Sequence, residues 1–490
     1  LGADYAPPHV DTHFSYPDDH NNFGRVSLRC VGIGECRRQE KGTMCPSYRV
    51  TMEEKHSTRG RARLLFEMLE GNPLSGGWKS EEVHDALDLC LACKGCKGDC
   101  PVNVDMATYK AEFLSHYYEG RLRPRHAYAM GWIFWWARLA SLAPNLVNLV
   151  THTPILGHLA KWAGGIAQKR SVPKFASQTF KQWFRERPVK NADYPPVILW
   201  PDTFNNHFHP QTAKAAVEVL EDAGFRVLVP QAALCCGRPL YDFGMLDTAK
   251  QMLRNILTEL QAEIRAGIPM VGLEPSCAAV FRDELKNLMP DDEDAKRLRE
   301  QTYTLAEFLQ KEADYHPPQL KRKAVVHGHC HQKAIMKFES DKEILKRLGL
   351  DFEVLDSGCC GMAGSFGFEA EHYDVSMDVG ELKVLPAVRE TANDTLLIAD
   401  GFSCREQIQD GTDRKALHLA EVLQMALEQG ELGREAKTPE LTYHRRHPQR
   451  LQLSSLERAL CLGVGAVMLG GLLSWKGRRL NAYFDTGSLS

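Results

Sequence analysis

The stretch Cys90-Leu-Ala-Cys93-Lys-Gly-Cys96-Lys-Gly-Asp-Cys100-Pro101 decides the fold of this chain. Its C-x2-C-x2-C-x3-C-P spacing is that of ferredoxin-type [4Fe–4S] sites. Three thiolates two residues apart wrap a tight loop around three corners of a cubane, and the fourth cysteine ligates the other cluster in two-cluster folds. All-cysteine zinc sites also use C-x2-C pairs, but usually two well-separated ones. The motif therefore predicts an iron–sulfur cluster, with zinc as the alternative.

A damaged copy of the motif lies upstream, at Cys30, Cys36 and Cys45-Pro46. Ile33 stands where the second cysteine would be, and an insertion displaces the fourth. Under the crossed rule, each cluster takes its last ligand from the other motif. The complete set is Cys45, Cys90, Cys93 and Cys96, and the incomplete set is Cys30, Cys36 and Cys100. Three thiolates suit a three-iron cluster, a cubane with one non-cysteine ligand, or no cluster.

The bulk properties are those of an ordinary globular protein. The 490 residues are 43% hydrophobic and 25% charged, and the net charge of -3 gives no reason to expect a nucleic-acid partner. The 15 cysteines cluster in metal-type spacings, which indicates a reducing cytoplasm rather than a disulfide scaffold. Leu1-Gly2-Ala3-Asp4 resembles no signal peptide and lacks an initiator Met, so we expect the back part of a longer polypeptide.

The second half contains an internal repeat of strands alternating with helices. Each copy has a Cys-Cys-Gly turn, at Cys235-Cys236-Gly237 and Cys359-Cys360-Gly361. Cys277 closes the first copy, and Cys330 and Cys404 flank the turn of the second. This alternation predicts two small α/β units with parallel sheets. The expected strands are Val197–Trp200, Phe225–Val229, Met270–Leu273, Ala324–Val326, Phe352–Leu355 and Leu396–Ala399.

We therefore predict an α+β multidomain protein, in which a helical ferredoxin-like [4Fe–4S] domain precedes two repeated cysteine-rich α/β domains. In the first domain, Ser57 or Thr58 is expected to cap a helix that runs through Leu69, and Ser80 is expected to cap the next helix. The expected boundaries are 1–25, a linker; 26–125, the [4Fe–4S] domain; 126–190, a helical connector; 195–315 and 320–428, the α/β domains; 429–455, a basic linker; and 456–490, an apolar tail.

Three further stretches carry expectations of their own. The tryptophan-rich run at 132–136 is read as core rather than membrane interface. Arg59, Arg61 and Arg63 are expected to form a solvated helix face or, alternatively, to meet an acidic cofactor or a partner domain. Lys94 and Lys97 place positive charge inside the cluster loop, which would raise the potential of the cluster. Residues 459–475 are uncharged, and basic residues flank them. They predict membrane attachment as a short span or an interfacial helix, or alternatively a buried terminal helix.

These motifs together resemble the iron–sulfur halves of FAD-linked D-2-hydroxyacid dehydrogenases of the D-lactate, glycolate and D-2-hydroxyglutarate type. The matching text covers about residues 25–425 and includes the Cys90 run, His56-Ser57-Thr58-Arg59-Gly60-Arg61-Ala62, Asp202-Thr203-Phe204 and both Cys-Cys-Gly turns. The resemblance implies FAD on a fused or partner domain, which oxidises the substrate and passes electrons to the [4Fe–4S] cluster. It further implies a quinone or another carrier as the final acceptor.

The Cys-Cys-Gly domains also resemble the cysteine-rich domains of heterodisulfide reductases, whose complete copies hold an unusual cluster. This chain departs from that pattern, with Asp202 and Glu274 at cysteine positions of the first copy and Gly401 at one of the second. A single metal ion, to which His327, His329 and His331 could add ligands, and metal-free buried thiols are the alternatives. The candidate metal ligands are Cys235, Cys236, Cys277, Cys330, Cys359, Cys360 and Cys404.

The sequence thus predicts an electron-transfer component of an oxidoreductase that carries neither the flavin nor the substrate site itself. The alternatives are an iron–sulfur component of a heterodisulfide-reductase-like enzyme or of an anaerobic glycerol-3-phosphate dehydrogenase, and a zinc-stabilised assembly module without activity. The expected location is the cytoplasm, at the membrane face if the tail is attached to the bilayer.

Overall fold

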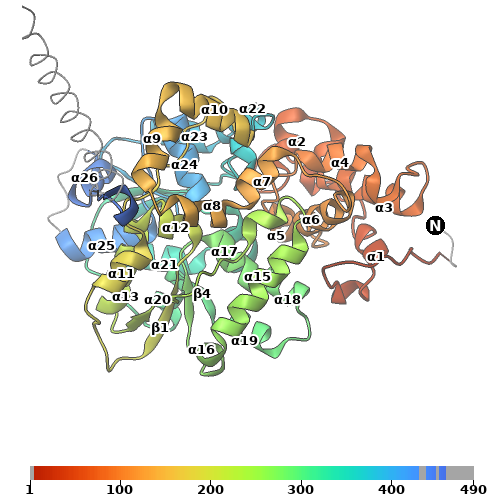
Figure 1. Cartoon of the computed structure of the whole chain (residues 1–490). Coiled ribbons are helices and arrows are strands. Elements are labelled where there is room, and N and C mark those ends of the chain that lie inside the picture. The colour runs from red at the N-terminus through yellow and green to blue at the C-terminus, as the bar shows by residue number, and fades with distance from the viewer. Residues whose placement is uncertain (1–4, 430–437, 449–451, 459–490) are drawn as a thin grey trace, which may run out of the picture.

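The computed structural model describes residues 5–429, 438–448 and 452–458. Figure 1 shows the N-terminal helices, red to orange, at one end of the molecule, and the α/β units, yellow-green to blue, at the other. The helical connector begins beside the N-terminal helices and continues over the α/β units. The small sheets are all parallel, and the architecture is the expected α+β one.

The N-terminal domain consists of short helices around the cysteine loops. Ser57 caps α3 by accepting a hydrogen bond from Gly60 N at 2.9 Å, and Ser80 caps α4 through Val83 N at 3.4 Å. Gly71 ends α3 at φ 69°, a backbone conformation that favours glycine. Both predicted caps are confirmed. The helices are α1 (Phe23–Ser27), α2 (Pro46–Thr51), α3 (Thr58–Glu70), α4 (Glu81–Asp88), α5 (Gly95–Asp99) and α6 (Met106–Tyr117).

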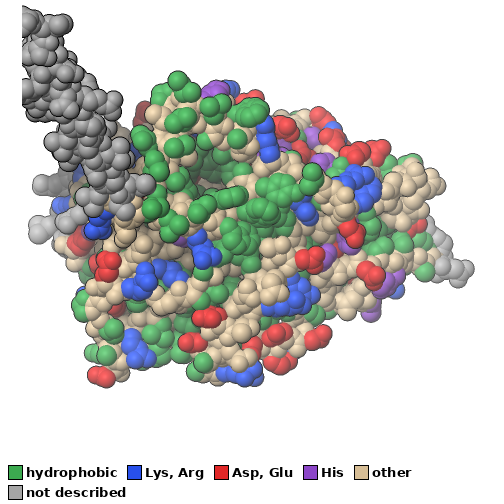
Figure 2. Space-filling view, viewed as in Figure 1, with side chains coloured by type: hydrophobic (Ala, Val, Ile, Leu, Met, Phe, Trp, Pro, Cys, Tyr) green, Lys and Arg blue, Asp and Glu red, His purple; other side chains and the backbone are tan. Residues whose placement is uncertain are grey.

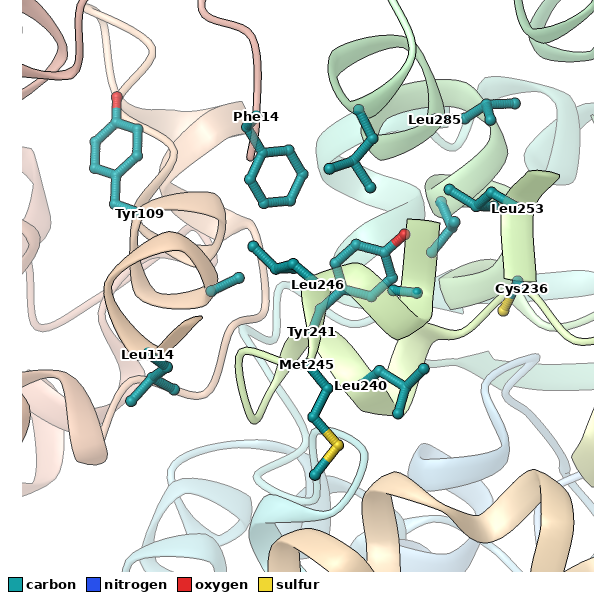
Figure 3. Close-up of a cluster of buried hydrophobic side chains, with 14 of the residues drawn as sticks. Phe14, Tyr109, Leu114, Cys236, Leu240, Tyr241, Met245, Leu246, Leu253 and Leu285 are labelled. Atoms are coloured by element: carbon teal, nitrogen blue, oxygen red, sulfur yellow. The ribbon is translucent and has the colours of Figure 1, made fainter. Parts of the chain in front are cut away.

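Within the described part of the linker predicted for residues 1–25, residues 13–23 are packed rather than extended through solvent. Phe14 and Phe23 are buried, and His13 N and Phe14 N donate to the buried carboxylate of Glu112. Figure 3 shows Phe14 between Tyr109 of α6 and Tyr241 of the first α/β unit. The aromatic residues spaced through this polar stretch fill the seam between two domains, a role that composition does not reveal.

The connector has five helices. Its tryptophans at 132–136 were predicted to lie in the core, and this prediction is wrong. In α8, Phe134, Ala137 and Ala140 face inward at helical spacing, which leaves Trp135 and Trp136 on the opposite face, 37% and 44% exposed. Figure 2 shows hydrophobic side chains gathered over this region. The helices are α7 (Arg125–Gly131), α8 (Ile133–Ala140), α9 (Pro144–His152), α10 (Pro154–Gly164) and α11 (Phe180–Glu186).

The first α/β unit has a four-stranded parallel sheet in the order β2-β1-β3-β4. Its predicted strands are present as β1 (Pro196–Trp200), β2 (Arg226–Leu228) and β3 (Met270–Gly272). Strand β4 (Thr302–Thr304) was not predicted, because three residues between two helices carry no readable alternation. The helices are α12 (Thr203–His207), α13 (Pro210–Asp222), α14 (Arg238–Tyr241), α15 (Leu246–Glu259), α16 (Gln261–Arg265), α17 (Pro275–Ala279), α18 (Leu285–Leu288), α19 (Glu293–Gln301) and α20 (Leu305–Lys311).

The second unit has a three-stranded parallel sheet, β6-β5-β7, built from β5 (Lys323–Val326), β6 (Asp351–Val354) and β7 (Leu396–Ile398). A single parallel bridge from Ile398 to Leu417 lies where β4 lies in the first unit. In both units the first strand is central, and the cysteine turns follow the carboxyl ends of strands, the edge where α/β sites form. The helices of the second unit are α21 (Glu339–Arg347), α22 (Tyr373–Glu381), α23 (Val384–Glu390), α24 (Phe402–Gly411) and α25 (Leu419–Gln429).

The two units share a core, and the chain returns to it after residue 429. Phe204 stacks on Phe402 with ring centroids 4.4 Å apart. In α26 (Pro439–Arg446), Tyr443 is buried and Glu440 pairs with Arg414, so this part of the predicted 429–455 linker is packed. The apolar stretch 459–475 lies outside the described residues. Among the described residues, no helix combines the length and hydrophobicity needed to cross a bilayer.

Candidate functional site: buried cysteine groups

The cluster loop follows α4 directly. Cys90 leaves the helix end, and Lys110 Nζ donates to Cys90 O at 2.8 Å, which fixes the start of the loop. Ala92 and Lys94 adopt left-handed backbone conformations that curl the loop between the thiols. Burial raises the pKa of Cys96 to about 12. A neutral thiol of this kind loses its proton when a soft metal binds, so the donor set fits an iron–sulfur cluster.

The upstream cysteines lie together beside the start of α3. Cys45 Sγ accepts from Thr58 N at 2.9 Å and contacts Cys36. The hydrogen bond from Cys45 is the main reason that the pKa of Cys36 falls to about 6. Cys30 lies near Cys36 and Cys100, as the incomplete set requires. The structure thus places Cys45 against Cys36 of the other set, and its assignment to the Cys90 cluster stays a prediction.

Arg61 belongs to this site, although the sequence suggested a solvated helix face. It is 2% exposed and donates from Nε to Ala86 O at 2.7 Å and from Nη2 to Ser47 Oγ at 3.0 Å. Its positive charge lowers the pKa of Cys45, which burial raises. Arg59 and Arg63 pair with Glu54 and Glu67 at the surface, as expected. Helical periodicity could have separated Arg61 from these two, because Ala62 and Leu65 mark the inner face of α3.

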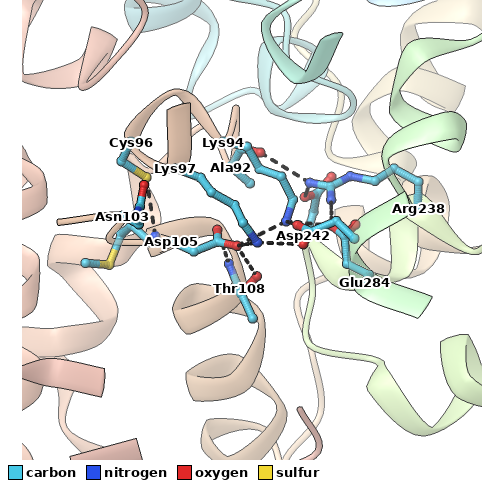
Figure 4. Close-up of polar contacts among 12 residues, drawn as sticks. Ala92, Lys94, Cys96, Lys97, Asn103, Asp105, Thr108, Arg238, Asp242 and Glu284 are labelled. Atoms are coloured by element: carbon cyan, nitrogen blue, oxygen red, sulfur yellow. Dashed lines mark hydrogen bonds and ion pairs between the residues drawn. The ribbon is translucent and has the colours of Figure 1, made fainter. Parts of the chain in front are cut away.

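A buried ion network holds the cluster loop against the first α/β unit (Figure 4). Lys94 Nζ lies 2.6 Å from Asp283, 3.1 Å from Glu284 and 3.3 Å from Asp105, and its side chain is fully buried. Lys97 pairs with Asp105 at 2.9 Å and with Asp283 at 2.6 Å. The expected positive charge inside the loop is therefore offset by carboxylates, and these lysines hold the loop in position.

Arg238 extends this network to the turn of the first unit. Its guanidinium lies 2.9 Å from Glu284 and 3.1 Å from Asp242, and it also donates to Ala92 O in the cluster loop. Arg238 follows Cys235-Cys236-Gly237 directly. One side chain therefore ties the first Cys-Cys-Gly turn to the [4Fe–4S] loop. This link needs tertiary structure, because 146 residues separate the partners in sequence.

The first cysteine-rich unit brings its three thiols together. Cys236 Sγ lies 2.9 Å from Cys277 Sγ, and Thr203 Oγ1 donates to Cys235 Sγ at 3.4 Å. Asp202 caps α12 by accepting from Phe204 N and Asn205 N. Burial and then the charge of Glu274 raise the pKa of Asp202 to about 6.

The second unit holds a richer donor set. His327 Nδ1 or Nε2, Cys360 Sγ and Cys404 Sγ lie within 4.8 Å of one another, all buried. Cys359 lies between Cys330 and Cys360, with which it shares hydrogen bonds. Hydrogen bonds from Cys359, Cys404 and His327 lower the pKa of Cys360 well below that of an ordinary thiol. A thiolate beside an imidazole and further thiols is a donor set that suits zinc or iron.

The cysteine groups of distant segments meet at Cys93 and Cys330. Cys93 and Cys330 interact electrostatically, and both pack in one cluster with Cys359 and Phe366. Gly98 of α5 approaches so closely that a Cβ there would lie 3.0 Å from Ala334 Cα of the second unit. The structure therefore brings the predicted [4Fe–4S] loop directly against the second cysteine-rich unit, and no sequence signal indicates this contact.

The comparisons with known proteins assign the cysteine groups to two kinds of domain. Residues 26–104 match the 4Fe-4S dicluster domain, and residues 202–282 and 325–409 match the Cysteine-rich domain. The chain is 28% identical to a D-2-hydroxyglutarate dehydrogenase of Pseudomonas putida over 81% of this chain and 43% of that protein. The chain thus spans less than half the length of this relative.

Two shorter relatives are covered more completely. The chain is 30% identical to a subunit of the anaerobic glycerol-3-phosphate dehydrogenase of Escherichia coli, over 58% of this chain and 72% of that protein. It is 33% identical to Lactate utilization protein A of Bacillus licheniformis over 44% of this chain and 93% of that protein. The chain belongs to the family of these two relatives, and it combines a 4Fe-4S dicluster domain with two copies of the Cysteine-rich domain.

Proposed function

We propose that this chain is the iron–sulfur electron-transfer part of a FAD-dependent D-2-hydroxyacid dehydrogenase. The observation that carries the proposal is the contact between the Cys90–Cys96 loop and Cys330, which lines up two buried cysteine groups from separate domains. A [4Fe–4S] cluster, when bound, accepts and releases one electron at a time. The acceptor in this proposal is a quinone or another carrier, and FAD is on a fused or partner domain.

We assign the [4Fe–4S] cluster to Cys90, Cys93, Cys96 and Cys45. Cys30, Cys36 and Cys100 hold no second all-cysteine cubane in this proposal, because Ile33 cannot ligate. The repeated α/β units hold a metal at their cysteine turns, and the second unit, with His327, Cys360 and Cys404, offers the better donor set. These side chains position the centres and exclude water from them, while the redox chemistry belongs to the cofactors.

Cysteine variants test the cluster assignment. Cys93→Ser should remove most of the reducible electron paramagnetic resonance signal and about four irons, while Cys100→Ser at the incomplete set should be milder. Iron and sulfide content distinguish the electron-transfer role from that of a zinc-stabilised assembly module. A colourless chain that contains zinc, or a Cys93→Ser variant with a full signal, would contradict the proposal.

Reconstitution tests the division of labour. Together with its flavin domain or partner, the chain should carry electrons from a D-2-hydroxyacid to ferricyanide, and by itself it should oxidise nothing. The similarity to a subunit of an anaerobic glycerol-3-phosphate dehydrogenase makes glycerol 3-phosphate the second substrate to assay. Electron transfer that is unchanged after Cys93→Ser would show that the chain is not on the electron path.

A further inference from the structure

A cavity of about 180 Å³ lies where the cluster loop, the connector and both cysteine-rich units meet. Its walls are mainly apolar, with Met130 and Ile133 from α7 and α8, and Phe204 and Phe402 from the two units. Polar groups gather among these walls. They are Arg238, Asp242, Glu274, His329 and His331. An apolar slot with a few convergent polar groups is the usual form of a small-molecule site.

The histidines offer hydrogen bonds that no described residue uses. His331 is 6% exposed, and its Nε2 is buried without a partner among the described residues. His329 Nδ1 accepts from His331 N at 3.2 Å, so the proton of a neutral His329 is on Nε2, which makes that atom a donor. Both residues flank Cys330, the thiol beside Cys93. The donor of His329 and the unpartnered ring nitrogen of His331 therefore lie next to the proposed electron path.

The connector helices that line the cavity also expose a broad apolar face. Leu139, Leu149 and Ile155 are 60%, 61% and 76% exposed, beside the half-exposed tryptophans of α8. Glu457 accepts from Asn145 N and Leu146 N at the start of α9. The last described residues thus lie at this face, immediately before the uncharged stretch 459–475. A face of this kind suits contact with a lipophilic ligand or a bilayer surface.

We propose that this cavity binds the ring of a lipophilic quinone, the electron acceptor of the function proposed above, on which this inference rests. The cavity is smaller than the roughly 300–1,000 Å³ of sites for drug-sized ligands, so it holds a ring and leaves the isoprenoid chain outside, along the apolar face. His329 Nε2 donates to one of the carbonyl oxygens.

Reduction of the quinone to the quinol consumes two electrons and two protons, and each carbonyl oxygen becomes a hydroxyl. The electrons come singly from the dehydrogenase through the iron–sulfur centre. A second cavity, of about 50 Å³, shares Leu91, Asp242, Ala363 and Ser365 with the first and offers a route for the protons. In it, Ser365 donates to Glu369 at 2.9 Å, and Glu369 lies 2.9 Å from His372. His372 in turn contacts the half-exposed carboxylate of Asp88.

Binding is tested on the full chain that carries its iron–sulfur centres, by equilibrium dialysis with decylubiquinone. Ile133→Trp narrows the cavity and should weaken binding at least tenfold. Leu122→Trp, at an exposed position before α7 that neither lines the cavity nor belongs to the apolar face, should leave binding unchanged. Decylbenzene, which lacks the carbonyls, should bind at least tenfold more weakly than decylubiquinone. The proposal is overturned if decylbenzene binds as tightly as decylubiquinone. It is also overturned if an Ile133→Trp variant with normal iron content and a normal unfolding midpoint binds decylubiquinone as tightly as wild type.

The proton route has a separate test in the complex with the flavin component. Glu369→Gln should lower kcat for quinone reduction at least tenfold, with KM and decylubiquinone binding unchanged. Ferricyanide takes up electrons without protons, so its reduction should stay normal. The matched control is Glu371→Gln, at an exposed neighbour. Equal quinone turnover by Glu369→Gln and Glu371→Gln refutes the proton route. A wild-type complex that reduces ferricyanide but does not bind decylubiquinone refutes the quinone site and leaves the proposed function intact. Loss of ferricyanide reduction in the wild-type complex would instead refute the proposed function.

Discussion

Replacing Lys94 by Met removes the ammonium group at the centre of the network behind the cluster loop. Methionine keeps most of the volume of the side chain, so the change is mainly one of charge. Removing one partner of a buried ion network commonly costs about 3–5 kcal/mol, because buried carboxylates lose their counter-ion. Here each carboxylate keeps a second cation: Lys97 for Asp105 and Asp283, and Arg238 for Glu284. We therefore expect the lower end, about 3 kcal/mol.

The matched control is Lys97→Met. Lys97 contacts Asp105 and Asp283 as well, but its side chain is 27% exposed, and both carboxylates keep Lys94 in that variant. Solvent screens part of its charge, so the expected loss is about 1 kcal/mol. In the Lys94→Met variant, Asp283 keeps only Lys97 as a counter-ion. Adding Asp283→Asn removes this carboxylate and should restore about 1 kcal/mol of the unfolding free energy.

Urea unfolding under anaerobic conditions measures these differences, with iron content per chain determined for every variant. Unequal metal loading would shift stability by mass action, so only variants with equal iron are compared. A Lys94→Met variant within about 1 kcal/mol of wild type, or no less stable than Lys97→Met, would refute the reasoning. So would an Asp283→Asn addition that destabilises further, because Asp283 would then not depend on Lys94.

Three further predictions concern other regions. Burial lowers the pKa of His372, but its bonds to Asp88 and Glu369 raise the pKa to about 9. The contribution of His372 to the free energy of unfolding, roughly 3 kcal/mol, should therefore be present below about pH 6.5 and lost as pH rises through 9. A difference in unfolding free energy between wild type and His372→Gln that stays constant across this window would contradict the prediction. Gly361→Ala should destabilise the second unit by at least about 2 kcal/mol in the same assay, because φ is 93° and a Cβ would lie 2.1 Å from Ser376 O, whereas Gly267→Ala, with open space, should cost about 1 kcal/mol. The full chain should sediment with membranes and resist high salt, while a chain ending at Arg458, which keeps the Glu457 cap of α9, should stay in the supernatant; equal partitioning would contradict attachment through the tail.

Local sequence patterns determined the helices and most strands. The caps at Ser57 and Ser80 and the runs around β1, β3, β5 and β7 carry signals within a few residues, so their positions could be predicted. The C-x2-C-x2-C-x3-C-P run likewise defines a metal site, because its ligands are close together in the chain. Strand β4 was missed because its three residues are too few to show an alternating pattern. The burial of α8 was predicted wrongly because its tryptophans face outward.

What the sequence determined is the inventory of this protein: a ferredoxin-type cysteine loop, two cysteine-rich α/β units and the family to which such a set belongs. Tertiary structure alone decided which of these groups meet. Cys93 lies beside Cys330, and Lys94 is buried against Asp283, because packing joins segments that have no local signal for each other. The same holds for the cavity between them, which no single segment encodes. Spacing along the chain fixes the ligands of a motif, whereas neighbours across a core are chosen by shape and charge.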